Sequence, residues 1–341
     1  MTTLLVAVRD SLWVIGRGND GWNAVERFAG KSRVQCVAAD PFRPSRVYCG
    51  TSSDGLWRSD DLGRSWVAVG AGVLHRHVTA VAVSAAERGD GGDAVVYAGT
   101  EPSAFYRSAD GGATWEERPS LLRLPSAPTW SFPPQPDTHH VRWIAPDPRM
   151  PERIFVAIEA GALVWSADAG RSWVDRRPDG PYDTHTLVVH PRTRDRLYSA
   201  AGDGYFESRT GGANWERRED GLRHRYAWGL AVDPSDPETV VISTARSARS
   251  AHSADGAESW IYRRAAGQPW RAVSQGLPDP AGTTISVLAT DPSETGVVYA
   301  ANNRGVYHSP NMGAMWERLN IPWPERHHSQ RIAGMAVTIA E

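Results

Sequence analysis

The sequence predicts an all-β fold: a seven-bladed β-propeller in which each blade is a four-stranded antiparallel sheet. Three observations lead to this fold class. Trp recurs at intervals of 42 to 58 residues, a short polar motif precedes most of these tryptophans, and 32 Gly and 24 Pro residues supply turns along the 341-residue chain. Such intervals are near the length of one propeller blade. The repeated tryptophans are Trp22, Trp66, Trp115, Trp173, Trp215, Trp270 and Trp316.

The polar motif reads Ser-x-Asp-x-Gly-x-x-Trp and is clearest at residues 59–66, 108–115 and 166–173. Thr or Asn replaces the Asp at 208–215 and 309–316, and the first and sixth repeats are degenerate. An Asp in such a turn accepts backbone N–H groups, and a Gly allows a left-handed backbone. We therefore assign the motif carboxylates to structure rather than to catalysis.

Two apolar segments precede each motif, and the first commonly ends in Asp-Pro. Residues 37–41 followed by 47–51, and residues 230–234 followed by 240–244, show this pattern. It is typical of a strand, a turn and a second strand. A third short strand, such as 55–58 or 305–308, leads into the motif, and a fourth begins at its Trp. Four such strands form one blade.

The strand order also predicts how the ring closes, because the chain begins with the apolar segment 4–8 and finishes on the unpaired segment 332–339. We expect the last strand to complete the first blade and so protect the strand edges. The prediction is a single domain over residues 1–341, with the first blade built from 1–30 and 331–341. The other six blades are expected at about 32–70, 77–118, 139–177, 184–220, 226–275 and 284–319.

Composition and charge exclude several classes of partner. The 37 basic and 39 acidic side chains are mixed along the chain, so no basic field attracts nucleic acid or an anionic membrane. The two cysteines are too few for a disulfide framework, and no leader-like or 18-residue apolar segment occurs. We expect a cytoplasmic protein. We expect no nucleotide cofactor either, because no Gly-rich phosphate loop precedes a helix.

The repeated motif resembles that of the Asp-box (BNR) repeat propellers, a sialidase-like group within the WD40/YVTN/BNR-like superfamily. The resemblance covers all seven repeats and implies the propeller fold. It leaves the function open, because the family includes sialidases, sortilin-type receptors, xyloglucanases and photosystem II assembly factors. The Arg-Ile-Pro start of the sialidases is absent here, and their catalytic domains have six blades. An exo-sialidase-type glycoside hydrolase therefore remains a minority alternative.

Polar side chains gather where the predicted inner strands begin. We aligned the inner strands on their Asp-Pro positions and compared the residues seven and five places upstream. Because strand side chains alternate with a period of two, both sets are expected on one side, at one mouth of the central channel. The first set is Arg33, His77, His140, Asp183, Tyr226, Thr284 and Arg331. The second set is Gln35, Thr79, Arg142, His185, Trp228, Ser286 and Ala333.

The histidines of these sets predict a divalent transition-metal site. His77, His140 and His185, together with Asp183, are the expected ligands, because imidazoles from several blades can converge with a carboxylate on one ion. The alternative for each imidazole is an ordinary solvated loop residue. Glu159 ends an apolar strand near these residues, a position suited to general acid or base catalysis. Its alternative is a hydrated turn glutamate.

The predicted catalytic set is Glu159, Asp183, Tyr226 and His252. The predicted substrate-binding set is Arg33, Arg142, Arg249, Arg331, Trp228 and Trp130. The arginines are expected to hold an anionic group, and Trp130 lies in one of two long connections, 119–138 and 319–330, expected near the mouth. These sets favour a hydrolase or lyase acting on a small anionic or carbohydrate-like substrate. The alternative is a non-catalytic propeller that binds a protein or peptide.

Overall fold

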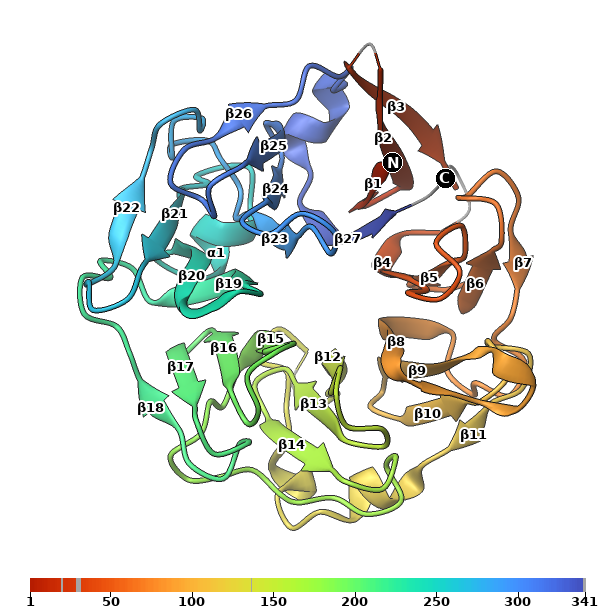
Figure 1. Cartoon of the computed structure of the whole chain (residues 1–341). Helices are drawn as coiled ribbons and strands as arrows, with labels where there is room; N and C mark the ends of the chain where they lie inside the picture. Colours follow the sequence, from red (N-terminus) through yellow and green to blue (C-terminus); the bar gives the residue numbers. More distant parts are fainter. Residues whose placement is uncertain (20, 29–31, 136, 340–341) are drawn as a thin grey trace.

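Seven antiparallel β-sheets surround a central axis in the computed structural model of the chain (Figure 1). The structure describes residues 1–19, 21–28, 32–135 and 137–339, so the expected ends of the first blade at residues 30 and 341 lie outside the described residues. The predicted all-β, seven-bladed fold is confirmed. One blade differs locally: the outer position of the fourth sheet is a single bridge between Trp165 and Val174.

The first blade joins the two ends of the described chain, as predicted. Strand β27 (Ile332–Ile339) pairs antiparallel with β1 (Thr2–Val8), so that Leu4 lies opposite Val337. Strands β2 (Ser11–Gly18) and β3 (Gly21–Arg27) continue this sheet outward. The ring is therefore closed by hydrogen bonds between residues more than 300 positions apart in the sequence.

The other six blades follow one another along the chain, each running from its inner strand outward (Figure 1). The second and third blades contain β4 (Val34–Ala39), β5 (Val47–Thr51), β6 (Leu56–Ser59), β7 (Val67–Ala68), β8 (His77–Arg88), β9 (Ala94–Glu101), β10 (Phe105–Ser108) and β11 (Glu116–Glu117). The fourth and fifth contain β12 (Val141–Pro146), β13 (Ile154–Ile158), β14 (Ala162–Ser166), β15 (Thr184–Val189), β16 (Leu197–Ala201), β17 (Gly204–Ser208) and β18 (Glu216–Arg217). The sixth and seventh contain β19 (Tyr226–Asp233), β20 (Asp236–Ala245), β21 (Ser259–Arg264), β22 (Arg271–Val273), β23 (Val287–Thr290), β24 (Val298–Asn302), β25 (Gly305–Ser309) and β26 (Glu317–Arg318).

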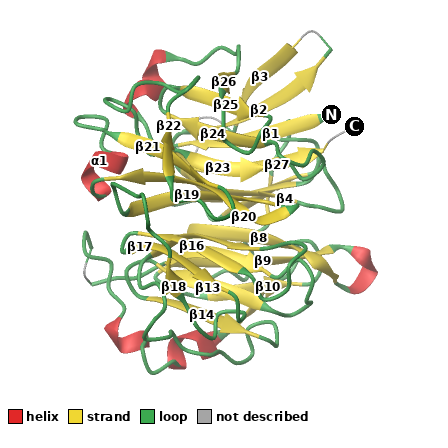
Figure 2. Ribbon diagram, turned by 60° about the vertical axis from the view of Figure 1, so that its left-hand side comes forward, coloured by secondary structure: helices red, strands yellow, loops and turns green. Residues whose placement is uncertain are grey.

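Helical segments are short and lie at the margins of the sheets (Figure 2). They are α1 (Ala248–His252) and the 3-10 turns η1 (Asp90–Gly92), η2 (Pro119–Arg123), η3 (Ala127–Thr129) and η4 (Glu325–Ser329). None of the helices in the described part of the chain has the length and apolar character needed to span a bilayer.

The repeated polar motif forms a hydrogen-bonded turn between the third and fourth strands. In the second blade, Ser59 Oγ donates to Asp61 Oδ1 (2.8 Å) and accepts the backbone N–H of Gly63 (2.7 Å). Asp61 also accepts the backbone N–H of Ser65 at 2.8 Å. Gly63 has φ +80°, a conformation that favours glycine. The same bonds recur in the turns at 108–115 and 166–173, so the motif carboxylates are structural.

These turns predict an acid-sensitive contribution to stability. Hydrogen bonds from Ser65 lower the pKa of Asp61 to about 2, whereas an Asp in an unfolded chain titrates near about 4. The ionised carboxylate therefore stabilises the fold fully above about pH 5, and this stabilisation is lost as the pH falls toward about 2. We expect Asp61→Asn to lower the free energy of unfolding at pH 7 by about 0.5 to 1 kcal/mol, a small loss because solvent screens the charge of this half-exposed side chain.

Urea unfolding of the wild type and Asp61→Asn at pH 7 and at about pH 2.5 checks this expectation. The difference between the two proteins should shrink at the lower pH. Asp255→Asn is the control, because Asp255 is exposed and lies outside the repeated turns. A difference that is equal at both pH values would contradict the assigned role of the Asp61 carboxylate.

Candidate functional site

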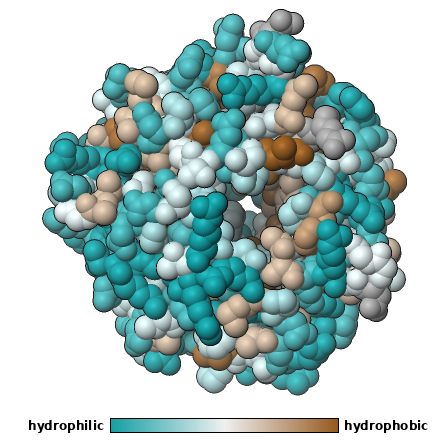
Figure 3. Space-filling model, viewed as in Figure 1, coloured by the Kyte–Doolittle hydropathy of each residue, from teal (hydrophilic) through white to brown (hydrophobic). Residues whose placement is uncertain are grey.

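A polar cavity of about 200 Å³ lies at one mouth of the central channel. Figure 3, which looks along the axis, shows the opening at the centre of the ring. Residues of five blades and of the connection before β12 form its wall. The cavity is lined by Gln35, His77, Thr79, Glu101, Phe132, Gln135, His140, Arg142, Glu159, Trp228, Arg331, Ile332 and Ala333.

Irregularities in the inner strands provide many of these side chains. In β12, Val141 pairs with Ile158 and Trp143 with Ala157, so Arg142 is an extra residue without a partner in the ladder. The same shift occurs near the start of β4, β8, β15 and β19 and at the matching place in β27. A β-bulge of this kind redirects the side chain of the extra residue. The residues at these shifts are Gln35, Thr79, Arg142, His185, Trp228 with Gly229, and Ala333.

Six of the seven residues of the predicted second set thus lie at bulges, whereas Ser286 lies directly before β23, whose pairing with β24 has no register shift. The sequence pattern predicts that simple alternation along regular strands brings both sets to one side. Local register shifts in the inner strands bring these side chains to the mouth instead, because each shift inserts one extra residue near the end of the strand that lies at the mouth.

Glu159 occupies the centre of the cluster, directly after the buried strand β13. Its carboxylate accepts a hydrogen bond from His140 Nε2 at 2.8 Å and lies 3.6 Å from Arg142 Nε and 4.0 Å from His185 Nε2. Burial alone would raise the pKa of Glu159. The hydrogen bond from His140 and the nearby charges of His140, His185 and Arg142 outweigh burial and hold that pKa well below its usual range. Glu159 is therefore an ionised, largely enclosed carboxylate.

A second carboxylate, Glu101, lies between two imidazoles on the neighbouring blade. Its Oε2 is 3.3 Å from His77 Nδ1 and 3.8 Å from His140 Nδ1. Burial lowers the pKa of His77, and the charge of Glu101 acts in the opposite direction. Phe132 packs edge-on against the His140 ring, with ring centres 4.8 Å apart. His140 thus links the two carboxylates under an aromatic cover.

Tyr226 and His252 form a neutral pair on the other side of the mouth. Burial, followed by the charge of Arg331, lowers the pKa of His252 well below its ordinary value. Burial and the charges of Glu159 and Asp183 raise the pKa of Tyr226. Both groups are therefore uncharged at neutral pH, and a hydrogen bond of 3.0 Å joins the Tyr226 hydroxyl and His252 Nε2.

Trp228 is 5% exposed and packs among the polar groups of the mouth. The Arg142 guanidinium lies 4.3 Å from the centre of the Trp228 ring, a cation–π contact. The rings of His185 and His252 pack on Trp228 with centres 4.4 and 4.2 Å away. This packing fixes the orientation of the surrounding polar groups.

The structure groups His185 with two carboxylates rather than with the other expected histidine ligands. One donor atom from each of Glu159, Asp183 and His185 lies within 4.8 Å of the others. His77 and His140 instead contact Glu101 and Glu159 as described above. The predicted set of three imidazoles is therefore not the set that the fold brings closest together.

An adjoining cavity of about 300 Å³ is rich in arginine. Within the described residues, Arg9, Arg33 and Arg331 form no ion pair with a carboxylate. Burial and the positive charge of Arg142 lower the pKa of Arg331. The cavity is lined by Arg9, Arg33, Val34, Gln35, His252, Ser329, Arg331 and Ala333. Unpaired guanidiniums in a concave site favour an anionic ligand.

Two predicted substrate-binding residues lie elsewhere. Trp130 is 5% exposed and belongs to the hydrophobic core between the third and fourth blades, where its indole N–H donates to Ser126 Oγ at 3.0 Å. Its position is a correction to the expected pocket wall, because the apolar ring gains more by burial than at a wet mouth. Arg249 is exposed on α1 and is not among the residues lining the two mouth cavities.

Gly202, which is absent from the predicted sets, belongs to the site through a close approach. A Cβ atom at this position would lie 2.0 Å from Asp183 Oδ2 and 3.2 Å from His185 Cε1. The backbone N–H of Gly202 donates to the carbonyl of Asp183 at 2.8 Å. A Gly at the end of a strand is a weak sequence signal, so only the structure links it to the site.

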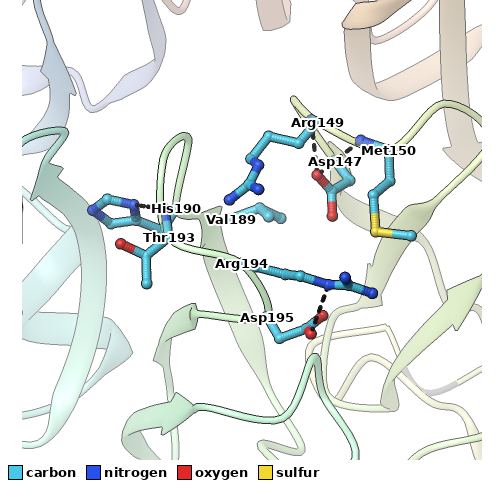
Figure 4. A pocket seen from close by; sticks show the side chains of 8 residues that line it. All are labelled: Asp147, Arg149, Met150, Val189, His190, Thr193, Arg194 and Asp195. Carbon is cyan, nitrogen blue, oxygen red and sulfur yellow. Dashed lines mark hydrogen bonds and ion pairs between the residues drawn. The ribbon is translucent and has the colours of Figure 1, made fainter.

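A different cavity, of about 250 Å³, lies at the opposite ends of β12 and β15 (Figure 4). Its charged groups have structural partners. Asp147 accepts the backbone N–H groups of Arg149 and Met150, and Asp195 pairs with Arg194 and Arg153. This cavity therefore consists of satisfied strand-to-strand turns, and the axial mouth is the better candidate site.

Comparisons with known proteins agree with the propeller fold. No family model matches the sequence. A probable oligoxyloglucan-reducing end-specific xyloglucanase of Neosartorya fischeri is 23% identical over 313 residues, which cover 86% of this chain and 33% of that protein. The chain thus spans about a third of this curated relative.

Solved structures of differently named proteins superpose on this chain. The GH74 xyloglucanase from Xanthomonas campestris superposes with a TM-score of 0.64 at 17% identity, covering 92% of this chain and 52% of that one. YCF48 from Cyanidioschyzon merolae superposes with a TM-score of 0.56 at 12% identity, covering 85% of both chains. These likenesses place the chain among the β-propellers and show a shared fold.

Proposed function

We propose that this propeller is a hydrolase that acts, at its axial mouth, on a small carbohydrate-type substrate carrying an anionic group. One observation carries the proposal: unpaired guanidiniums and an enclosed, ionised Glu159 face adjoining cavities of one mouth. The 23% identical relative is named as a xyloglucanase, which supports a carbohydrate substrate. The hydrogen-bonded Ser-Asp-Gly turns support Asp-box repeats as the source of the scaffold.

The charge distribution suggests how the substrate is oriented. Arg33 and Arg331 bind the anionic group, since no described carboxylate neutralises them. The sugar ring lies in the cavity of about 200 Å³ that Glu159 lines together with the small exposed part of Trp228. The bond to be cleaved then lies over Glu159.

The catalytic work falls to Glu159 and its two neighbours. One donor atom from each of Glu159, Asp183 and His185 lies within 4.8 Å of the others, so together they orient one water molecule, and Glu159 accepts a proton from it. As the glycosidic bond breaks, Arg142, 3.6 Å from Glu159, stabilises the negative charge on the leaving-group oxygen, which then takes a proton from bulk water. Tyr226 and His252 supply neutral hydrogen-bonding groups to the substrate.

Chromogenic glycosides test this proposal directly. The purified full chain is assayed with 4-nitrophenyl glucuronide and glucoside, each in both anomeric forms, with a 4-nitrophenyl sialoside and with xyloglucan oligosaccharides. We expect kcat/KM to be at least about tenfold higher for the glucuronide of the preferred anomer than for the matching glucoside. Preference for neutral substrates, or binding without turnover, would contradict the proposal, and the latter would favour a ligand-binding propeller.

The same assay separates a sialidase and a lyase from the proposed hydrolase. Turnover of the sialoside alone would indicate the exo-sialidase. An oligouronate is added as a further substrate, and an unsaturated product detected by ultraviolet absorbance would indicate a lyase.

We expect Arg331→Met to raise KM for the glucuronide by about tenfold to a hundredfold, because a charge-assisted hydrogen bond is lost. KM for the glucoside should change little. Arg123→Met is the matched control, because Arg123 is exposed on η2. Steady-state kinetics on both substrates measure the effect. An equal change in KM for the charged and neutral sugars would show that Arg331 does not read the anion.

A further inference from the structure

We propose that Glu159, Asp183 and His185 form a binding site for one divalent transition-metal ion. Only the catalytic role of the ion rests on the proposed function. The binding of the ion is argued from the donor atoms alone. The three side chains come from two adjacent blades: Glu159 follows β13, while Asp183 precedes β15 and His185 belongs to it.

His185 is held like a metal ligand. Its Nδ1 lies 2.7 Å from the carbonyl oxygen of Ala227, which can only accept, so Nδ1–H donates there and Nε2 is the ring nitrogen left for an ion, whose binding displaces any proton on it. The side chain is 1% exposed, yet Nε2 has no hydrogen-bond partner in the described structure. Nε2 faces Asp183 Oδ2 at 3.5 Å and Glu159 Oε1 at 4.0 Å. A hydrogen bond from one ring nitrogen to a carbonyl is the usual support for ligation by the other.

In each carboxylate, likewise, one oxygen accepts a hydrogen bond from outside the cluster and the other faces His185. Glu159 Oε2 accepts from His140 Nε2, and Asp183 Oδ1 accepts the backbone N–H of Ala160 at 2.7 Å. Glu159 Oε1 and Asp183 Oδ2 are the atoms nearest Nε2. Three donors therefore converge, and each is positioned by a separate hydrogen bond outside the cluster.

The backbone around the cluster keeps this space open. A Cβ at Gly202 would collide with Asp183 Oδ2, so the glycine preserves the position of the free oxygen. Asp203 fixes the same segment by accepting the backbone N–H of Asp183 at 3.1 Å. Asp183 is thus held in place on both sides.

The donor set defines the class of ion. Two carboxylate oxygens and one imidazole nitrogen suit Zn²⁺ or Mn²⁺. Ligands of a tetrahedral Zn²⁺ lie about 3.4 Å apart, given bonds of about 2.1 Å, so a small rotation of the Glu159 side chain brings all three donors into range. Three protein ligands leave a coordination position for water, as in catalytic rather than structural sites. Such an ion would lower the pKa of the bound water.

Direct binding measurements on the metal-stripped full chain test the site. Isothermal titration with ZnCl₂ and, separately, MnCl₂ should show one equivalent bound for at least one ion, and the thermal midpoint should rise with that ion. His185→Gln, Asp183→Asn and Glu159→Gln should each weaken binding by at least about tenfold. His77→Gln is the matched control: it removes a mouth imidazole outside the cluster and should retain one equivalent. Circular dichroism verifies that each variant is folded.

Failure of the metal site and failure of the hydrolase proposal give different results. Absence of a bound equivalent in the wild type, or equal loss in His77→Gln and His185→Gln, would overturn the metal site. Glucuronide hydrolysis that persists in the stripped protein, with no ion bound on titration, would leave the hydrolase standing without the metal. One bound equivalent without any hydrolysis would leave the metal site standing without the hydrolase.

Discussion

Replacing Glu159 with glutamine should reduce kcat/KM for the preferred glucuronide by about 10² to 10⁴-fold. Glutamine keeps the volume and the hydrogen bond with His140 but cannot accept a proton from water. Burial opposes ionisation of Glu159, but His140, His185 and Arg142 overcome it, so the wild-type carboxylate is ionised at neutral pH. We expect the loss mainly in kcat, because the anion-binding arginines are unchanged.

Two further variants make this result specific. Glu159→Asp retains the charge and should recover part of the activity. Glu294→Gln is the remote control, since Glu294 is half-exposed and 3.9 Å from Arg17 on the surface. Thermal melts separate catalytic loss from unfolding. A folded Glu159→Gln protein with wild-type kcat/KM would remove Glu159 from the mechanism.

Replacing Glu207 with glutamine should lower the free energy of unfolding by about 3 to 5 kcal/mol. Glu207 lies between the fifth and sixth blades and is 2% exposed. It accepts hydrogen bonds from Arg264 and, at 2.9 Å, from the Tyr205 hydroxyl, and it forms an ion pair with Arg196 at 2.9 Å. Burial raises the pKa of Glu207, but the two guanidiniums reverse this effect and lower it. Removing the anion leaves two buried cations without their shared partner.

Urea unfolding at pH 7 measures this loss, with Glu294→Gln again as the matched control. The exposed Arg17–Glu294 pair should contribute less than about 1 kcal/mol. A similar loss for both variants would mean that the buried network contributes no more than a surface ion pair. Because Glu207 is remote from the mouth cavities, the folded fraction of Glu207→Gln should retain its substrate preference.

The propeller could be predicted from the sequence because its signals are local and repeated. Each motif turn is completed within seven residues, as the bonds among Ser59, Asp61 and Gly63 show, so each copy supports the others. Closure by β27 was also predictable, since an unpaired apolar strand needs a partner. The reduced outer strand of the fourth blade could not be predicted, because the sequence that forms its single bridge is similar to the sequences that form two-residue strands in other blades.

The site was predictable only as a set of positions. Alignment of the inner strands brought His140, Arg142 and His185 to one mouth, and the structure places them there. Their pairing was hidden, because Glu159 follows a different strand of the same blade and Ala227 belongs to another blade. The position of Trp130 could not be predicted either, because an aromatic residue in a long connection gives the same sequence signal whether it lines a cavity or packs in a core.

The bulged positions of the inner strands have a consequence for how such a protein can change. A bulged residue contributes a side chain to the mouth but no pair to the ladder, so its replacement leaves the neighbouring strand pairs in register. Six blades each provide one such position independently. New specificities can therefore arise by exchanging side chains one blade at a time, while the sheets that hold them remain unaltered.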